Sequence, residues 1–473
     1  MTCCAKLVLK VSSNKKNQGK SCEIGLFSLP LPLFFNNKPI FSQFKNNKIM
    51  KVLLTFIIIC VSSLTAMAQT ITVKVDVTND WKEDKADEPV VVKLSDVKGL
   101  NFEAKSVTVT YKGDDVPFQL DDMDCDQRAD ELFFLTDIKG KETKTFEVKF
   151  SAKENKKATP VEPRIYTALQ LRDKQDKHPD VLRVEAKGTS NIFNDIYMHG
   201  ITVESDVVGY RIYFDERQNI DLYGKQQRRI ELPETQFYTT SDQLEKGYGV
   251  DVLWAGQAIG CGSFKDWQKK KPVNWTDVGL RGQRIVTTGP LRTIVEVYDL
   301  GVKTPEAEDM LYDLHQYYTL YAGHRDMAVD IQYTKTASGK KSIEKLFCTG
   351  VQKVGVTADE KTRKGHKPQG FVKKDGIAGS WGCDYPDMGK KQQWAPEAIG
   401  MAVYMPKEYI RDTKEDDLNY LFVVKPDSKG ALHYHLTFCA DKEAEGYHTA
   451  KEWFASLDDW QEALEHPVRV KVK

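Results

Sequence analysis

Several features are scarce in this sequence, and each scarcity removes a class of protein. It holds nine cysteines, of which five follow residue 68: Cys125, Cys261, Cys348, Cys383 and Cys439. They are scattered, odd in number and without a C-x-x-C pair, which excludes a disulfide scaffold and a cysteine zinc site. One or two disulfides stay open for a periplasmic protein. The sequence also has no repeat of fixed period and no Gly-rich phosphate loop.

Long apolar runs are absent as well. The longest, from Val52 to Val61, has about ten residues, and a membrane span needs roughly 20. It follows the basic start Met50-Lys51 and precedes Ala66-Met67-Ala68, an A-x-A cleavage pattern. We therefore expect a cleaved secretory signal over residues 50–68, no transmembrane span, and a periplasmic or secreted protein.

A signal peptide belongs at the start of a chain, so residues 1–49 need an explanation. This segment is rich in Lys, Asn, Phe and Ser without a sustained period. We expect it to be a mis-assigned start; the alternative is a disordered leader. Residues 1–68 hold nine Lys and one Glu, which leaves 59 basic and 67 acidic residues, about −8 net. That balance argues against nucleic acid as the partner.

What is present is β-structure along nearly the whole chain. Short runs such as "ITVKVDV", "SVTVTY" and "KTFEVKF" are rich in β-formers and bounded by turn residues. We predict a mainly β fold: a small N-terminal β-sandwich over 69–156, then a large antiparallel β-supersandwich over 157–473. One short helix is expected in "AKEWFASLDDWQEALEHP", where apolar side chains recur at helical spacing: Trp453, Leu457, Trp460 and Leu464.

Two polar rows stand on neighbouring predicted strands in "GYRIYFDERQNIDLYGK". Alternation places Arg211, Tyr213 and Asp215 on one face. After a turn, Asp221, Tyr223 and Lys225 repeat this chemistry. The rows line either a binding site or an ordinary solvated sheet face with cross-strand ion pairs.

A third row lies in "DLHQYYTLYAGHRD", where Tyr317 and Tyr321 share a parity with His315 and the turn brings His324 and Arg325 to their end. Tyr rings suit the apolar face of a sugar, and Arg holds a carboxylate with two parallel bonds. The alternative is an aromatic row packed in a core. His-Arg-Asp here is not a kinase loop, because the required downstream Asn is missing.

Three further groups could carry chemistry. "DDMDCDQRADEL" spaces acidic oxygens as a structural calcium loop does, or forms a merely acidic hairpin; the residues are Asp122, Asp124, Asp126 and Asp130. Trp254 and Trp381 stand in Gly-rich segments expected to be loops, where an exposed Trp is a usual sugar platform. His433 and His435 are a weak metal signal without a third ligand. No organic cofactor is indicated.

Taken together, these segments resemble a family of secreted bacterial proteins known as a domain of unknown function, found beside enzymes that degrade pectin-like, uronate-containing glycans. The resemblance covers roughly residues 70–470. Its most specific pattern is H-G-x-x-x-E…Y-R-x-Y-F-D…I-D-L-Y-G-K, matched by His199, Glu204, Tyr210, Arg211, Asp215, Asp221, Tyr223 and Lys225. The acidic loop of such relatives reads D-x-D-G-D-G, whereas Cys125 and Gln127 replace both glycines here, which puts calcium in doubt. The large domain of the family is similar to the supersandwich of mutarotase-like proteins and several polysaccharide lyases.

The resemblance favours an enzyme that cleaves a uronate-containing polysaccharide or oligosaccharide by β-elimination. That reaction needs a cation on the substrate carboxylate, a base for the C5 proton and an acid for the leaving oxygen. The candidates are Arg211 or Arg325, His199 or His324, and Tyr317 or Tyr321, in that order.

A hydrolase would instead use a carboxylate pair such as Glu204 and Asp215. A non-catalytic glycan-binding protein would use the same surface without a tuned pKa, and a structural envelope protein is a third alternative. Substrate contacts are expected from Glu204, Tyr213, Asp215, Tyr223, Lys225, Trp254 and Trp381.

Overall fold

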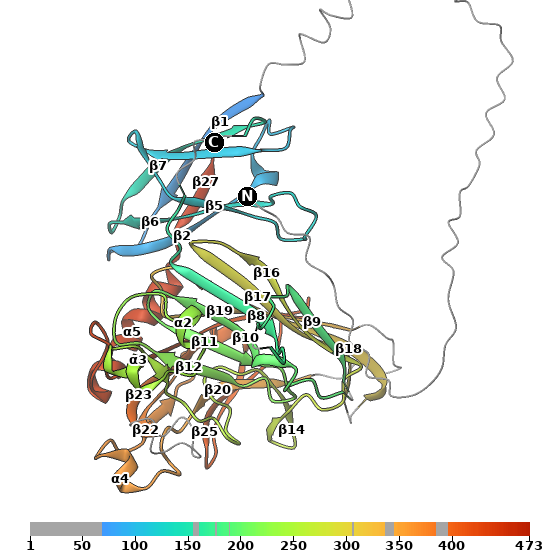
Figure 1. Cartoon of the computed structure of the whole chain (residues 1–473), viewed down its shortest axis with the longest axis vertical. Coiled ribbons are helices and arrows are strands. Elements are labelled where there is room, and N and C mark those ends of the chain that lie inside the picture. The colour runs from blue at the N-terminus through green and yellow to red at the C-terminus, as the bar shows by residue number, and fades with distance from the viewer. Residues whose placement is uncertain are drawn as a thin grey trace, which may run out of the picture.

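The protein is described by a computed structural model over residues 69–154, 160–175, 177–188, 190–304, 307–335, 345–384 and 396–473 (Figure 1). The expected signal segment and the residues before it lie outside this part of the chain. About 49% of the structure is strand and 9% helix, so the mainly β prediction is confirmed.

A small sandwich of two sheets lies at one end of the molecule (Figure 1). Its sheets have the strand orders β27-β1-β7-β3-β4 and β2-β6-β5. Alternate residues of β1, Val73, Val75 and Val77, point into its core, as the period of two in "ITVKVDV" requires. The strands are β1 (Thr70–Thr78), β2 (Lys85–Lys93), β3 (Ser106–Tyr111), β4 (Asp114–Asp115), β5 (Phe118–Asp121), β6 (Glu131–Ile138), β7 (Thr143–Ser151) and β27 (Arg469–Val472).

The last strand crosses the boundary that the sequence suggested. β27 pairs antiparallel with β1, with Val472 opposite Val75 and Val470 opposite Val77. Val468 and Val472 pack against the small core. The expected range 157–473 had placed this strand in the large domain, because a four-residue strand at the chain end gives no signal of its distant partner.

Three antiparallel sheets build the large domain. A nine-stranded sheet has the order β21-β22-β23-β26-β19-β18-β17-β16-β9, and two five-stranded sheets have the orders β13-β12-β11-β10-β8 and β15-β14-β20-β25-β24. Their strands are β8 (Ile165–Leu171), β9 (Arg183–Lys187), β10 (Ile196–Ser205), β11 (Gly209–Tyr213), β12 (Ile220–Gly224), β13 (Val250–Asp251), β14 (Lys265–Gln268), β15 (Lys271–Val273), β16 (Leu280–Thr288), β17 (Arg292–Thr304), β18 (Ala307–Tyr321), β19 (Met327–Lys335), β20 (Phe347–Gln352), β21 (Gln369–Val372), β22 (Ile377–Asp384), β23 (Glu397–Tyr404), β24 (Ile410–Glu415), β25 (Asn419–Val424) and β26 (Ala431–Ala440).

One continuous apolar core separates these sheets. Tyr210 and Ile212 of β11 and Tyr318 and Leu320 of β18 all lie in it, fully buried. The opposite side chains of β11 and β18 therefore face outward, on opposite outer faces of the sandwich.

The predicted C-terminal helix is α5 (Ala450–Glu465). It begins at Thr449, whose hydroxyl accepts from Glu452 N, and it packs Trp453 and Leu457 onto β22 and β23. The other helices are short: α2 (Leu232–Thr235), α3 (Ser241–Glu245) and α4 (Glu360–Arg363). Among the described helices, none has the length and apolarity that crossing a membrane requires.

A buried arginine joins the small sandwich to the large domain. Arg292 of β17 donates from Nε to Asp121 Oδ2 at 2.9 Å and from Nη2 to Glu131 at 2.8 Å. Its guanidinium lies 4.6 Å from the Phe133 ring centre. Gln119 accepts from Arg292 N and donates to Arg292 O. The arginine therefore fixes where β5 and β6 meet the turn before β17.

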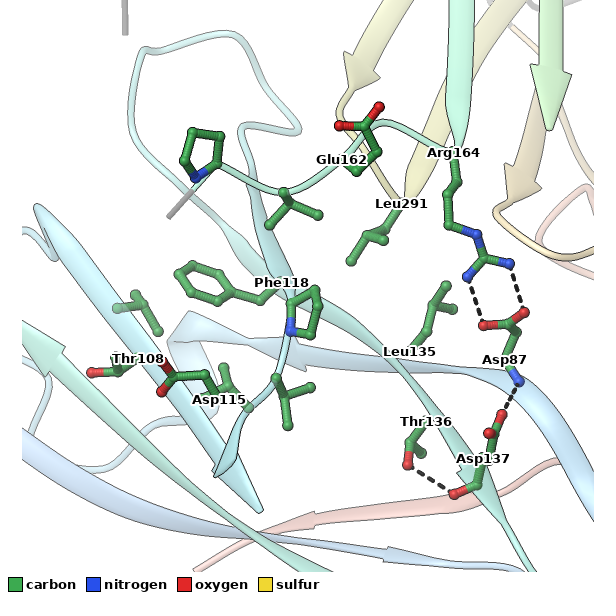
Figure 2. Close-up of a pocket in the computed structure, with 16 residues that line it drawn as sticks. Asp87, Thr108, Asp115, Phe118, Leu135, Thr136, Asp137, Glu162, Arg164 and Leu291 are labelled. Atoms are coloured by element: carbon green, nitrogen blue, oxygen red, sulfur yellow. Dashed lines mark hydrogen bonds and ion pairs between the residues drawn. The ribbon is translucent and has the colours of Figure 1, made fainter. Parts of the chain in front are cut away.

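A second clamp lies beside a cavity of about 720 Å³ between the small sandwich and the chain that enters β8 (Figure 2). Arg164 grips Asp87 with two parallel bonds of 2.8 and 2.7 Å. The rest of the lining is mostly apolar, with Phe118, Leu135 and Leu291 around it. Among the described residues that line this cavity, the titratable groups are the acids and Arg164 at its edges.

We expect Arg292→Met to lower the free energy of unfolding by about 3–5 kcal/mol, because Asp121 would stay buried without its cation. Urea unfolding of the purified protein measures this. The control is Arg469→Met, which removes an exposed pair with Asp80 and should change nothing measurable. Equal free energies of unfolding for the two variants would contradict the prediction that Arg292 stabilises the interface.

Candidate functional site

The polar rows of β11 and β12 face away from the apolar core, as the alternation predicts. Arg211 lies opposite Asp221, and Tyr210 lies opposite Leu222 on the other face. This polar face is not open to water, because the segment 226–249 with α2 and α3 covers much of it and packs Leu232 and Phe237 against Tyr223. Most of the rows form a second, polar interior.

Glu204 and Lys225 hold that interior together. Both are essentially unexposed, and Lys225 Nζ lies 2.6 Å from Glu204 Oε1. The same carboxylate accepts from Glu231 N and Leu232 N at 2.7 and 3.0 Å, where α2 begins. Tyr223 Oη donates to Gly249 O at 2.8 Å. These residues of the family pattern position the covering segment, and a substrate does not reach Glu204.

His199 stands at a β-bulge. Met198 and His199 both have left-handed backbones, with φ of 57° and 61°, and the register of β10 against β8 shifts between Tyr197 and Thr202. No residue other than glycine fits at position 200, because a Cβ of Gly200 would lie 2.0 Å from Ile212 O. Paired left-handed residues without glycine cost free energy and cluster at functional sites.

The bulge aims His199 onto Phe193. The two rings stack at 4.1 Å, and His199 Nδ1 lies 3.1 Å from Phe193 O. Burial lowers the pKa of His199, and the cations Arg211 and Arg172 act in the same direction, so the ring is neutral near pH 7. A neutral ring that donates from Nδ1 to a carbonyl keeps Nε2 as an acceptor.

Beside Phe193 opens a depression of about 150 Å³. Phe193, Tyr213 and Trp254 supply its aromatic lining, and Asp221 and Asp251 its buried acids. Trp254 is 42% exposed, which is unusual for a side chain of this size. Aromatic faces beside acids match the apolar face and the hydroxyl groups of a sugar.

Arg211 holds the acids of the depression in place. Its Nε donates to Asp221 Oδ2 at 3.1 Å, and Nη2 donates to Asp221 as well and to Tyr213 Oη at 2.8 Å. Asp251 Oδ2 lies 3.4 Å from Nη2. The rings of Tyr213 and Phe237 lie 4.8 and 4.6 Å from the guanidinium carbon. Arg211 is therefore engaged on every side and is not free to take a substrate carboxylate.

The two acids lie against the same arginine, and one of them has a raised pKa. Burial raises the pKa of Asp251 well above its ordinary range, and the neighbouring Asp221 carboxylate raises it further. Two carboxyl groups in contact cannot both ionise cheaply. The neutral form of Asp251 is therefore favoured, beside the Asp221 carboxylate that Arg211 holds.

The aromatic row of β18 lies on the opposite outer face. Tyr317 is partly exposed beside Glu296, and Glu296 also lies 2.6 Å from His315 Nδ1. Tyr321 stacks on Phe133 of the small sandwich at 5.5 Å. The core separates this row from Arg211 and His199, so the structure does not bring the two proposed sets of catalytic groups together.

The turn after β18 meets the small sandwich. His324 Nε2 lies 2.9 Å from Asp87 O, and Nδ1 lies 3.3 Å from Asp326 Oδ1. Arg325 donates to Glu443 at 2.8 Å. The side chains of His324, Arg325 and Asp326 line a cavity of about 430 Å³. Burial alone would lower the pKa of His324, but Asp326 and the Asp87 carbonyl raise it to about 9. A protonated histidine is no general base at neutral pH.

Trp381 and Asp215, which were expected to contact substrate, do not line the depression. Trp381 stands in β22, not in a loop, and is 1% exposed beneath α5, so a sugar cannot stack on it. Asp215 accepts from Arg217 N and Gln218 N at 2.9 and 2.8 Å and shapes the turn between β11 and β12. The sequence interpretation missed Phe193 and Asp251. Asp251 begins the "DVLW" segment that carries Trp254, and its chemistry was the available signal.

The acidic loop joins β5 to β6. Oxygens of Asp122, Asp124 and Asp130 lie within 4.8 Å of one another, and Asp126 is not in this group. Cys125 and Gln127 have φ of 67° and 72°. They therefore keep the left-handed backbone that glycine would adopt at the same two positions. Carboxylate oxygens at this spacing suit calcium, and calcium binding stays a prediction.

The fold and the depression define an antiparallel β-sandwich protein with a small acid-and-aromatic site. Residues 77–470 match the family described as "Domain of unknown function (DUF4861)", and the chain belongs to this family. No curated protein matches.

Solved structures that are similar to this chain include three at 8% identity. One is a protein in the glycosyl hydrolase family 38 from Enterococcus faecalis, with a TM-score of 0.38, 85% of this chain and 47% of that chain covered. Another is an alpha-mannosidase from Enterococcus faecalis V583, with a TM-score of 0.40, 85% of this chain and 46% of that chain covered. The third is a protein assigned as an aldose 1-epimerase from Klebsiella pneumoniae, with a TM-score of 0.29, 63% of this chain and 95% of that chain covered. The chain spans about half the length of the first two.

We expect calcium to raise the melting temperature of the purified protein, because an ion that binds only the folded loop stabilises it. Asp124→Asn should abolish the shift, since it removes one of the three clustered carboxylates. Asp126→Asn, in the same loop but outside the cluster, is the matched control and should keep it. A melting temperature indifferent to calcium would contradict the prediction.

We also expect the stability given by His324 to depend on pH. The pKa of His324 in the folded protein is about 9, above the ordinary 6.5. Its contribution to the free energy of unfolding is therefore complete below about pH 6.5 and disappears as the pH rises through 9. His324→Gln should cost about 3 kcal/mol at pH 6 and little near pH 10. Urea unfolding at both pH values measures it. An equal cost of His324→Gln at both pH values would refute the prediction.

Proposed function

We propose that this protein binds the sugar units of a glycan in the depression lined by Phe193, Tyr213 and Trp254. The observation that carries the proposal is the exposed Trp254 beside the buried acid pair Asp221 and Asp251. A sugar ring would lie on the indole face, and its hydroxyl groups would meet the carboxyl oxygens.

The charge of the site favours the hydroxyl groups of the sugar as ligands. Asp221 and Asp251 already engage Arg211, so the floor supplies no free cation. Arg217 is the cation in the lining, and its Nε already donates to Asp215 at 3.0 Å. A glycan that carries uronates would place its carboxylate near Arg217, at the rim.

A uronate lyase is the second candidate, and His199 is the observation that favours it. Its ring is neutral, its Nε2 is an acceptor, and a costly bulge fixes its direction. In a lyase built on this site, His199 would take the C5 proton and Arg217 would replace Arg211 as the cation. Tyr213 would supply the nearby hydroxyl group. Tyr317 and Tyr321 have no part in such a lyase, because they lie on the other side of the core. His324 and Arg325 have none either, because their side chains are held at the turn after β18 by the Asp87 carbonyl and by Glu443.

A hydrolase that uses a carboxylate pair has less support. Catalytic carboxyl groups of glycosidases stand about 5–5.5 Å apart in retaining enzymes and about 6.5–9.5 Å apart in inverting enzymes. Asp221 and Asp251 both lie against Arg211, so neither carboxyl group is free to act as an acid or a nucleophile. Glu204 is enclosed beneath α2, so it cannot serve with Asp215.

Trp254→Ala should weaken glycan binding at least about tenfold, or about 1.4 kcal/mol, because it removes the stacking surface. Calorimetric titration with a panel of neutral and uronate-containing oligosaccharides measures this. Leu182→Ala, which truncates another exposed apolar side chain outside the depression, is the control. A panel without any ligand, or a ligand held equally well by Trp254→Ala, would refute the proposed site.

The same mixtures report on catalysis. A lyase would release products with an unsaturated bond that absorbs in the ultraviolet, and His199→Gln would abolish the signal while it keeps binding. Binding without this absorbance, and without new reducing ends, would leave a glycan-binding protein.

A further inference from the structure

A pair of histidines stands on the outer face of the nine-stranded sheet, away from the depression. His433 and His435 are two apart on β26 and therefore share a face. Their Nε2 atoms lie 2.9 Å from each other. The adjacent core residues Leu432, Tyr434 and Leu436 point the other way. The two rings thus converge on one point at the outer surface.

Each ring is held from behind by a carboxylate. His433 Nδ1 lies 2.9 Å from Asp330 Oδ1, and His435 Nδ1 lies 3.2 Å from Asp326 Oδ2. Asp330 is opposite His433 across the β19–β26 ladder. Asp326 is itself held by His324. Both imidazoles therefore have the carboxylate partner that metal-binding histidines usually have at their second nitrogen.

The hydrogen bonds decide which nitrogen carries the proton. An ionised carboxylate only accepts, so each Nδ1 is the donor, and a neutral ring then has a lone pair on Nε2. Two lone pairs pointed at each other over 2.9 Å repel. The arrangement is stable only when a positive species lies between them, either a metal ion or a single shared proton.

The space around the pair admits an ion from solvent. The His433 side chain is 40% exposed and that of His435 is 15% exposed. On the β19 side the neighbouring side chains are small, because Ala328 is opposite His435 and Thr319 is opposite Ala328 on β18. On the β23 side Tyr404 is opposite His435. Two nitrogens on one metal ion at about 2.0–2.1 Å stand roughly 3 Å apart or slightly more, close to the observed separation.

We propose that His433 and His435 bind one transition-metal ion through their Nε2 atoms, with its remaining positions open to water or to a ligand oxygen. Among the described residues, the acidic loop is the only group of three or more His, Cys, Asp or Glu side chains clustered for a metal. The histidine pair therefore supplies only two ligands, so a bound metal ion would keep open coordination positions and would exchange with solvent. Imidazole nitrogens select copper, nickel and zinc, whereas calcium and magnesium prefer oxygen.

The experiment titrates Cu²⁺, Ni²⁺ and Zn²⁺ into untagged protein, with calorimetry for affinity and electron paramagnetic resonance for the ligands of Cu²⁺. We expect one ion per chain, the order of affinity Cu²⁺ above Ni²⁺, and a copper spectrum split by two nitrogens. His433→Ala and His435→Ala should each abolish this binding. His448→Ala, an exposed histidine elsewhere, is the matched control and should keep it.

A milder variant separates metal binding from a folding defect. Asp330→Asn leaves both nitrogen ligands in place and removes only the carboxylate behind His433, so affinity should fall about 10–100-fold while the melting temperature of the metal-free protein stays unchanged. No binding of any of the three metals, or copper that keeps its spectrum in both alanine variants, would overturn the proposal. In the first case the pair shares a proton, which nitrogen NMR of the imidazoles would show.

Discussion

The constraint on which the site depends is that charge buried within a sandwich must be paired. One face of β10–β12 meets the apolar core, and the other carries Glu204, Arg211, Asp221 and Lys225 beneath the segment 226–249. Enclosing these groups costs several kcal/mol per ion unless each meets an opposite charge and hydrogen-bond partners. Lys225 with Glu204, and Arg211 with the acid pair, meet that requirement. The pairing in turn fixes where α2 begins and where the acids of the depression stand.

The sequence predicted which way the side chains of these strands point, because a period of two is a local property. It did not predict what covers the polar face. Solvent and ligand were the two expected neighbours of the rows, whereas the structure places a folded segment of the same chain against most of them. That segment has short helices and little periodicity, so its destination depends on contacts such as Glu204 with Leu232 N, which no local pattern reveals.

The glycines around Trp381 led to the wrong prediction of a loop, and the reason is physical. Glycines on both sides of a Trp predict a loop, yet "GSWGC" runs through the middle of β22. Gly382 is there because a Cβ would lie 2.3 Å from Val354 O, so glycine serves close packing rather than a turn. The same limit applies to distant pairs. Nothing local indicates that β27 joins β1, or that the rows of β11 and β18 lie on opposite faces of one core.

The small sandwich is more than an appendage to the large domain, because its docking continues into the histidine pair. Arg164 holds the Asp87 carboxylate while the Asp87 carbonyl lies against His324. His324 then lies against Asp326, and Asp326 against His435. Each link is a directed hydrogen bond, and a chain of such bonds in a partly buried setting orients every member. A shift of the sandwich would therefore move the carboxylate that fixes His435, which connects the interface between the two parts with the chemistry of the outer face.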